Sequence, residues 1–86
     1  MRVYVPTALR SYTGQKGRVD AEGSTLGEVL TDLDRHYPGF HFRIINEQDG
    51  IREHIKIFVN QQQVRDLAVP LRGGDEIQII CALSGG

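Results

Sequence analysis

One amphipathic helix constrains the fold of this chain more than any other feature. Thr25 and Glu28 have the spacing of a capping box, and Pro38-Gly39 stops the helix that begins there. Between these signals, apolar side chains recur at helical spacing: Leu26, Val29, Leu30, Leu33 and Tyr37. Burial of the aliphatic members contributes about 6–12 kcal/mol as an upper bound. A helix with one such face must lie on a sheet.

Strand patterns occur on both sides of the helix. Residues 2–6 and 17–21 alternate before it, and residues 7–16 between them are predicted to be a polar loop with a turn at Thr13-Gly14-Gln15. After the helix, residues 40–45 are predicted to form a single helical turn. Residues 54–60, 63–65 and 76–82 are then predicted to be strands.

The order of these elements indicates an α+β fold. A hairpin, a helix and further strands place the helix on one face of a mixed sheet, and the first and last strands form a central parallel pair. We therefore predict the β-grasp, or ubiquitin-like, fold, with four to five strands and one main helix. At 86 residues the chain makes one domain, with residues 1–82 as the folded unit and residues 83–86 as a flexible tail.

Alternation along the strands separates the two faces of the predicted sheet. If the aliphatic side chains of the strands meet the helix, then Tyr4, Phe58 and Ile80 face outward. Three neighbouring strands would then present a contiguous apolar patch, which is typical of a partner-binding site. Cys81 falls on the inward face, so we expect a small buried hydrophobe there and not a sulfur relay.

The end of the sequence, Leu83-Ser84-Gly85-Gly86, points to chemistry at a carboxylate. Glycine adds backbone freedom without bulk, and five extended residues reach roughly 16 Å beyond the sheet. Such a tail can pass through a narrow channel and deliver the Gly86 carboxylate to a distant active site. Adenylation with ATP gives this carboxylate a good leaving group, and attack by sulfur then yields a thiocarboxylate. The carrier needs no catalytic side chain of its own.

Charge and composition argue against several classes of function. Ten Lys and Arg against eleven Asp and Glu leave a net charge of −1, without the basic surplus typical of nucleic-acid binding. One cysteine excludes a disulfide framework, and the histidines lack the spacing of metal ligands. No nucleophile–base pair or cofactor motif appears, so we expect no catalytic residue, metal or bound cofactor. Lacking a signal-peptide core or membrane span, the chain is expected to be cytoplasmic.

The sequence resembles the MoaD/ThiS family of ubiquitin-like sulfur carriers. The resemblance rests on Leu71-x-x-Gly74-Asp75-Glu76-Ile77, on Ser84-Gly85-Gly86 and on Phe58-Val59-Asn60. The N-terminal half, from Val5-Pro6-Thr7 to Asp32-Leu33, is similar to the CysO-type branch of the family. Residues 80–82 read Ile-Cys-Ala where molybdopterin-type carriers have an aromatic-proline segment.

The resemblance implies a function and a set of partners. An ATP-dependent activating enzyme would adenylate Gly86, which would then become a thiocarboxylate. In the CysO-type branch the sulfur goes to an activated serine derivative to make cysteine, and a metalloprotease releases the product. Molybdopterin, thiamine, a thiolated tRNA or a secondary metabolite are the alternative sulfur acceptors.

Two other classes of function fit part of the pattern. A protein modifier would use the same adenylate to join Gly86 to a lysine through an isopeptide bond. A β-grasp binding module would recognise RNA or protein through its sheet and carry an inert tail. An enzyme fits least well, because no catalytic constellation is present.

Overall fold

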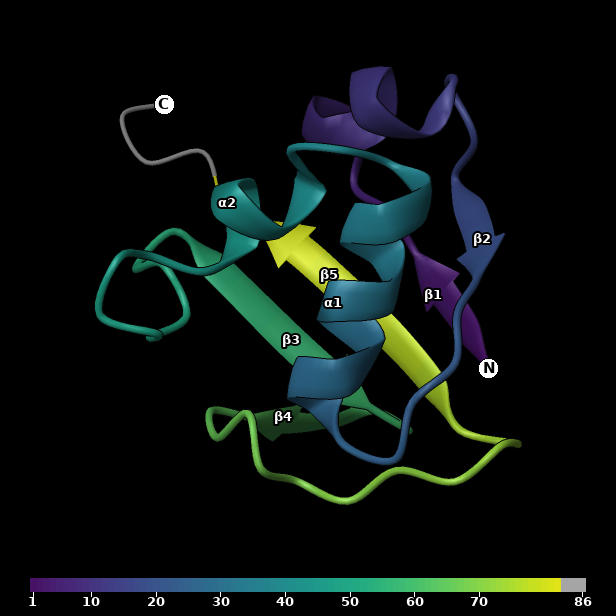
Figure 1. Ribbon diagram of the computed structural model, residues 1–86, viewed down its shortest axis with the longest axis vertical. Coiled ribbons are helices and arrows are strands. Elements are labelled where there is room, and N and C mark those ends of the chain that lie inside the picture. The colour runs from purple at the N-terminus through teal and green to yellow at the C-terminus, as the bar shows by residue number, and fades with distance from the viewer. Residues whose placement is uncertain (83–86) are drawn as a thin grey trace.

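The protein is built on a mixed sheet with one long helix across one of its faces (Figure 1). The computed structural model describes residues 1–82. The strands are β1 (Arg2–Tyr4), β2 (Arg18–Asp20), β3 (Ile55–Val59), β4 (Gln62–Val64) and β5 (Glu76–Cys81). The helices are η1 (Thr7–Thr13), α1 (Leu26–His36) and α2 (Phe40–Ile44), of which η1 is a 3-10 helix.

The topology places the last strand at the centre of the sheet. The strand order is β2-β1-β5-β3-β4, and β5 runs parallel to β1 and antiparallel to β3. The predicted central parallel pair and the five-stranded form of the predicted sheet are thereby confirmed. Because β5 has a hydrogen-bonded neighbour on each side, the point where it ends is held firmly in place.

The core lies between the sheet and α1. Its fully buried side chains come from every layer of the fold and include Val3, Leu26, Val29, Leu30, Leu33, Phe40, Ile44, Ile57 and Ile77. The apolar stripe of the predicted helix is therefore buried as expected, except that Tyr37 packs against the core only in part. The predicted helical turn near residue 40 is confirmed as α2, which contributes Phe40 and Ile44.

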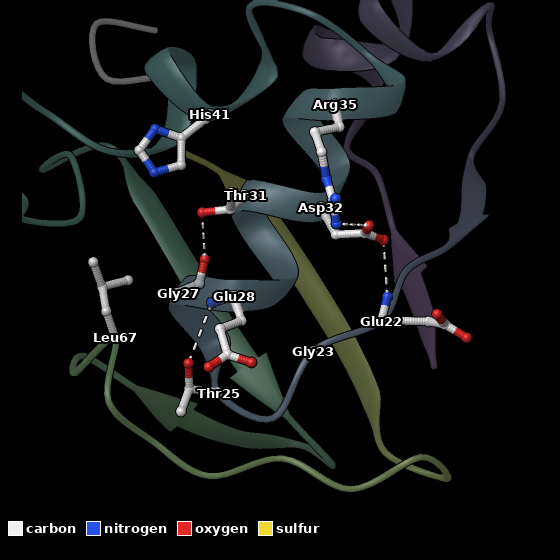
Figure 2. A pocket seen from close by; sticks show the side chains of 10 residues that line it. All are labelled: Glu22, Gly23, Thr25, Gly27, Glu28, Thr31, Asp32, Arg35, His41 and Leu67. Carbon is white, nitrogen blue, oxygen red and sulfur yellow. Dashed lines mark hydrogen bonds and ion pairs between the residues drawn. The ribbon is translucent and has the colours of Figure 1, made fainter.

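The start of α1 differs slightly from the predicted capping box. The Thr25 hydroxyl accepts a hydrogen bond from the Glu28 backbone N–H at 3.2 Å, as Figure 2 shows. The Glu28 carboxylate accepts from the Ser24 backbone N–H at 2.8 Å, one residue before the cap. The Leu26 and Gly27 backbone N–H groups donate to carbonyl oxygens of the loop at residues 67–69. The first turn therefore has its free donors satisfied from both sides.

The prediction of a polar loop at residues 7–16 is wrong, because most of this segment is η1. Leu9 is 3% exposed, and Thr13 is fully buried with its hydroxyl 2.8 Å from the Lys16 carbonyl oxygen. One buried leucine and one internally bonded threonine suffice to order a short 3-10 helix, which a periodicity search does not detect. The predicted turn is confirmed by left-handed φ angles at Gly14 (62°) and Gln15 (68°).

Asp32 makes stability depend on pH. Its carboxylate accepts from the Glu22 backbone N–H at 3.0 Å and pairs with Arg35 at 2.8 Å. The hydrogen bond from Glu22, with help from Arg35 and the nearby His36, lowers the pKa of the Asp32 carboxyl despite its burial. A carboxyl whose pKa falls on folding stabilises the fold fully above its unfolded pKa, and this contribution is lost as pH falls through the folded pKa.

Asp32→Asn is therefore expected to lower the free energy of unfolding at pH 7 by about 1 kcal/mol, since it replaces a charged acceptor by a neutral one. The difference from wild type should shrink as pH falls below about 3.9, where the carboxyl of the unfolded chain binds a proton before that of the folded protein does. Urea unfolding of both proteins between neutral pH and about pH 2.5 measures this. A difference that stays constant over that range would contradict the assignment.

Candidate functional site

The predicted tail follows β5 in the sequence. The Ala82 backbone N–H donates to the His54 carbonyl oxygen at 2.7 Å and so fixes the last described residue. Cys81 and Ala82 are called the tail root here. In Figure 1 the head of the β5 arrow lies beside α2, at the end of the sheet opposite the turn that precedes β5. The predicted tail and reactive residues, Leu83, Ser84, Gly85 and Gly86, lie outside the described residues.

The outer face of the sheet, away from α1, carries the three predicted docking residues. Tyr4 and Phe58 lie on either side of Gln78 in the β1-β5-β3 register, and Ile80 lies opposite Lys56. Ile80 is 37% exposed, whereas Tyr4 and Phe58 are half-buried. The prediction of a contiguous apolar patch is wrong, because the register inserts Gln78 between the two aromatic rings. The outer face is therefore a mixed surface with apolar islands.

Charged groups frame this outer face at the end of the sheet remote from the tail root. The Tyr4 hydroxyl donates to the Glu76 carboxylate at 3.4 Å, and Arg2 pairs with the same carboxylate at 3.4 Å. The side chains of Arg2 and Glu76 are 58% and 50% exposed. Exposed ion pairs of this kind contribute little to stability and are better suited to setting register with a partner.

Cys81 faces the helix side of the sheet, as its inward phase predicts. It is half-buried, is a free thiol and packs against the core. It also lines a hollow of about 470 Å³ at the tail root, together with Ala8 and Leu9 of η1 and with Phe42, Arg43, Glu47, Arg52 and His54. This hollow lies between η1, α2 and the end of β5.

Sequence reasoning missed a second surface beside the tail root. Phe42 on α2 is 57% exposed, and the Arg52 guanidinium lies 4.7 Å from its ring centroid. Arg43 lies 5.8 Å from the ring centroid of Tyr12. Phe42, Arg43 and Arg52 are called the α2 surface below. The available signal was the pair Phe40 and Phe42: two positions in one helical turn point to nearly opposite sides, so burial of one exposes the other.

A hollow of about 800 Å³ lies along α1 and not at the tail root (Figure 2). Its polar groups pair with one another: Asp32 with Arg35 and Glu22, and the Thr31 hydroxyl with the Gly27 carbonyl oxygen at 3.0 Å. No residue of β5 lines it. We therefore take the tail root, and not this hollow, as the candidate site.

Within residues 1–82, no group of three or more His, Cys, Asp or Glu side chains is arranged to hold a metal ion. In the same part of the chain, no helix has both the length and the apolar character needed to cross a membrane.

The sequence is similar to a known family and to known proteins over nearly its whole length. The sequence matches the ThiS family over residues 3–86. It is 37% identical over 89 residues to the sulfur carrier protein CysO of Mycobacterium tuberculosis, covering 98% of this chain and 96% of the relative. It is 32% identical over 83 residues to the small archaeal modifier protein 3 of Haloferax volcanii, covering 90% of this chain and 88% of the relative.

A similar fold occurs in a solved complex. The match is to the crystal structure of the Amycolatopsis orientalis BexX/CysO complex, with a TM-score of 0.92 and 32% identity. The alignment covers 99% of this chain and 98% of the matched chain. The fold and the family resemblance predicted from the sequence are both confirmed by these comparisons.

Proposed function

The chain belongs to the ThiS family, and from this we propose that it is a sulfur carrier that transports sulfur as a thiocarboxylate at Gly86. The observation that carries the proposal is the near-full-length similarity to sulfur carrier protein CysO, on a fold whose central strand leads into Ser84-Gly85-Gly86. Carriers of this kind are cosubstrates and not catalysts. The residues from 1 to 82 then serve to hold and present the tail.

The proposed chemistry has two steps, both at the Gly86 carboxyl. In the first, a carboxylate oxygen attacks the α-phosphate of ATP, so that an acyl-adenylate forms and pyrophosphate leaves. In the second, hydrosulfide attacks the carbonyl carbon and AMP leaves with the carboxylate oxygen; loss of a proton gives the thiocarboxylate. ATP is needed because a free carboxylate is a poor electrophile until it has a leaving group. In this proposal the activating enzyme, and not the carrier, binds the ATP.

Two kinds of partner are needed. One is an ATP-dependent activating enzyme, and the other is a biosynthetic enzyme that accepts the sulfur. The similarity to CysO favours an activated serine derivative as the acceptor, with a metalloprotease to release the cysteine formed. We propose that the activating enzyme contacts the outer face at Tyr4, Phe58 and Ile80, because these apolar side chains are exposed or half-buried and Ile80 lies next to the tail root.

Intact-mass measurement tests the function. The protein is incubated with an activating enzyme of the family, ATP and sulfide, and exchange of one oxygen for sulfur should raise its mass by about 16 Da. Omission of ATP is the control and should leave the mass unchanged. If the mass stays constant with activating enzymes that load other carriers of this family, the proposal is wrong.

A second candidate function, protein modification, is favoured by the similarity to small archaeal modifier protein 3. The two functions share the adenylate and diverge at the group that attacks it: sulfur for a carrier, a lysine amine for a modifier. Immunoblots of a cell extract under reducing and denaturing conditions separate them. A ladder of larger species indicates a modifier, and one band at the size of the free protein indicates a carrier.

Ile80→Asp tests the outer face. Ile80 is the exposed large apolar side chain nearest the tail on that face, and a buried unpaired carboxylate is costly at an interface. We expect the KM of the activating enzyme for this carrier to rise about tenfold or more, with kcat nearly unchanged. Steady-state kinetics of pyrophosphate release measures both values.

Gln62→Asp is the matched control, since Gln62 is an exposed residue of β4 at the other end of the sheet, level with Ile77. Its KM should equal that of wild type. Equal KM values for Ile80→Asp and Gln62→Asp would remove the docking role from the outer face.

A further inference from the structure

The α2 surface combines an exposed ring with two arginines that form no ion pair within residues 1–82. The Nε of Arg52 donates to the Phe42 carbonyl oxygen at 2.8 Å while its guanidinium lies over the Phe42 ring. These two contacts hold Arg52 in one orientation against an exposed apolar group. Aromatic and arginine side chains held together in this way are typical of the residues that dominate protein–protein interfaces.

The charge of this surface is not balanced within the described residues. No carboxylate of residues 1–82 forms an ion pair with Arg43 or Arg52. Glu47 is the one acidic residue among those that line the adjoining hollow, against Arg43, Arg52 and His54. The surface therefore has the charge to complement carboxylates on another molecule. Arginine is suited to this because its planar guanidinium binds a carboxylate through two hydrogen bonds.

The length of the tail favours an enzyme that acts on Gly86 as the molecule that covers this surface. Residues 83–86 span at most about 14 Å even when fully extended. An enzyme that acts on Gly86 must therefore approach Ala82 closely and contact the protein surface around it. The hollow that contains Cys81, Phe42 and Arg52 lies at this point. The α2 surface thus lies beside the tail root on the helix side of β5, and Ile80 lies beside it on the outer side.

We propose that the α2 surface is a second docking site for the activating enzyme, which places carboxylate side chains against Arg43 and Arg52 and an apolar side chain against Phe42. This inference rests on the proposed function. The enzyme would then contact the tail root from both sides of the sheet, through Ile80 on the outer side and through the α2 surface on the helix side. Opposite charge at such a rim speeds the encounter and orients the carrier.

Charge reversal tests the proposal. Arg52→Glu places a negative charge where the enzyme is expected to have carboxylates, so the KM for adenylation should rise about tenfold or more with kcat unchanged. The increase should diminish between about 0.05 M and about 0.5 M salt, because salt screens exposed charges. Arg43→Glu should act in the same direction, and it leaves the contact between Arg52 and Phe42 in place.

The matched control is Arg65→Glu, an exposed arginine that follows β4 and does not line the hollow at the tail root. It makes the same change in net charge and should leave KM unchanged. Circular dichroism and thermal unfolding verify that each variant is folded. Phe42→Ala should also raise KM, but by an amount that does not depend on salt.

The outcomes separate the two proposals. If wild type gains no mass with ATP and sulfide, the proposed function fails, and the docking site fails with it. If wild type is loaded but both Arg52→Glu and Arg43→Glu have the KM of Arg65→Glu, only the docking site is overturned. The docking site is also overturned if these reversals slow delivery to the sulfur-accepting enzyme while loading stays normal, because the surface then belongs to that enzyme.

Discussion

Deletion of Gly85 and Gly86 is expected to reduce loading of the carrier with sulfur by about a hundredfold or more, because a displacement of even 1 Å at a reacting centre is costly. The deletion moves the reactive carboxylate back by two residues, about 7 Å of extended chain. An activating enzyme that aligns the carboxylate with ATP cannot make up that distance. The mass gain of the carrier with ATP and sulfide measures the loss.

The same variant should fold normally. The deletion leaves every core side chain of the described residues in place, and the last described backbone hydrogen bond is made by Ala82. Its urea midpoint should therefore match that of wild type. Gly86→Ala is a graded companion, since it keeps the length and adds one methyl group, and it should be loaded slowly but measurably. Normal loading of the deletion variant would favour a binding module with an inert tail.

Leu30→Ala is expected to have the largest effect on stability. Leu30 is fully buried between α1 and the sheet, and removal of such a side chain costs about 2–5 kcal/mol through lost burial and the cavity left behind. For a domain of this size, that is a large part of the total stability. Urea unfolding monitored by circular dichroism gives the difference in the free energy of unfolding.

Thr31→Ala is the control on the same helix. Thr31 is exposed, and its hydroxyl bonds only to the helix backbone, at the Gly27 carbonyl oxygen. Its substitution should change stability by no more than about 0.5 kcal/mol. Where Leu30→Ala is still folded, it should be loaded with sulfur at the wild-type rate, because no part of the tail root is altered. A loss below about 1 kcal/mol would contradict the view that α1 anchors the core.

The elements with strong periodicity could be predicted from the sequence. The helical repeat from Leu26 to Leu33 predicts one buried face of the helix. Alternation predicts one buried face of the sheet, formed by Ile55, Ile57, Ile77 and Ile79, and these two faces pack together. The capping residue Thr25 set the start of α1 correctly. Pro38-Gly39 set its end to within a residue or two, since Tyr37 is the C-cap.

The remaining features depend on contacts between distant segments. Thr13 looks like an ordinary loop residue until the fold buries it, and η1 therefore resembles a polar loop in the sequence. Alternation placed Tyr4 and Phe58 on one face but could not place Gln78 between them, because strand register is set by pairing across the sheet. Arg52 and Phe42 meet only when the loop after α2 folds back, and no local pattern encodes that contact.

The most direct test of the account locates the sulfur atom on the loaded protein. Trypsin cleaves after Arg72, and the C-terminal peptide of residues 73–86 contains both Cys81 and Gly86. Fragmentation of this peptide should place an added mass of about 16 Da on Gly86 only in samples that received ATP. An added mass of about 32 Da on Cys81, as a persulfide, or no ATP-dependent change at Gly86, would contradict the account.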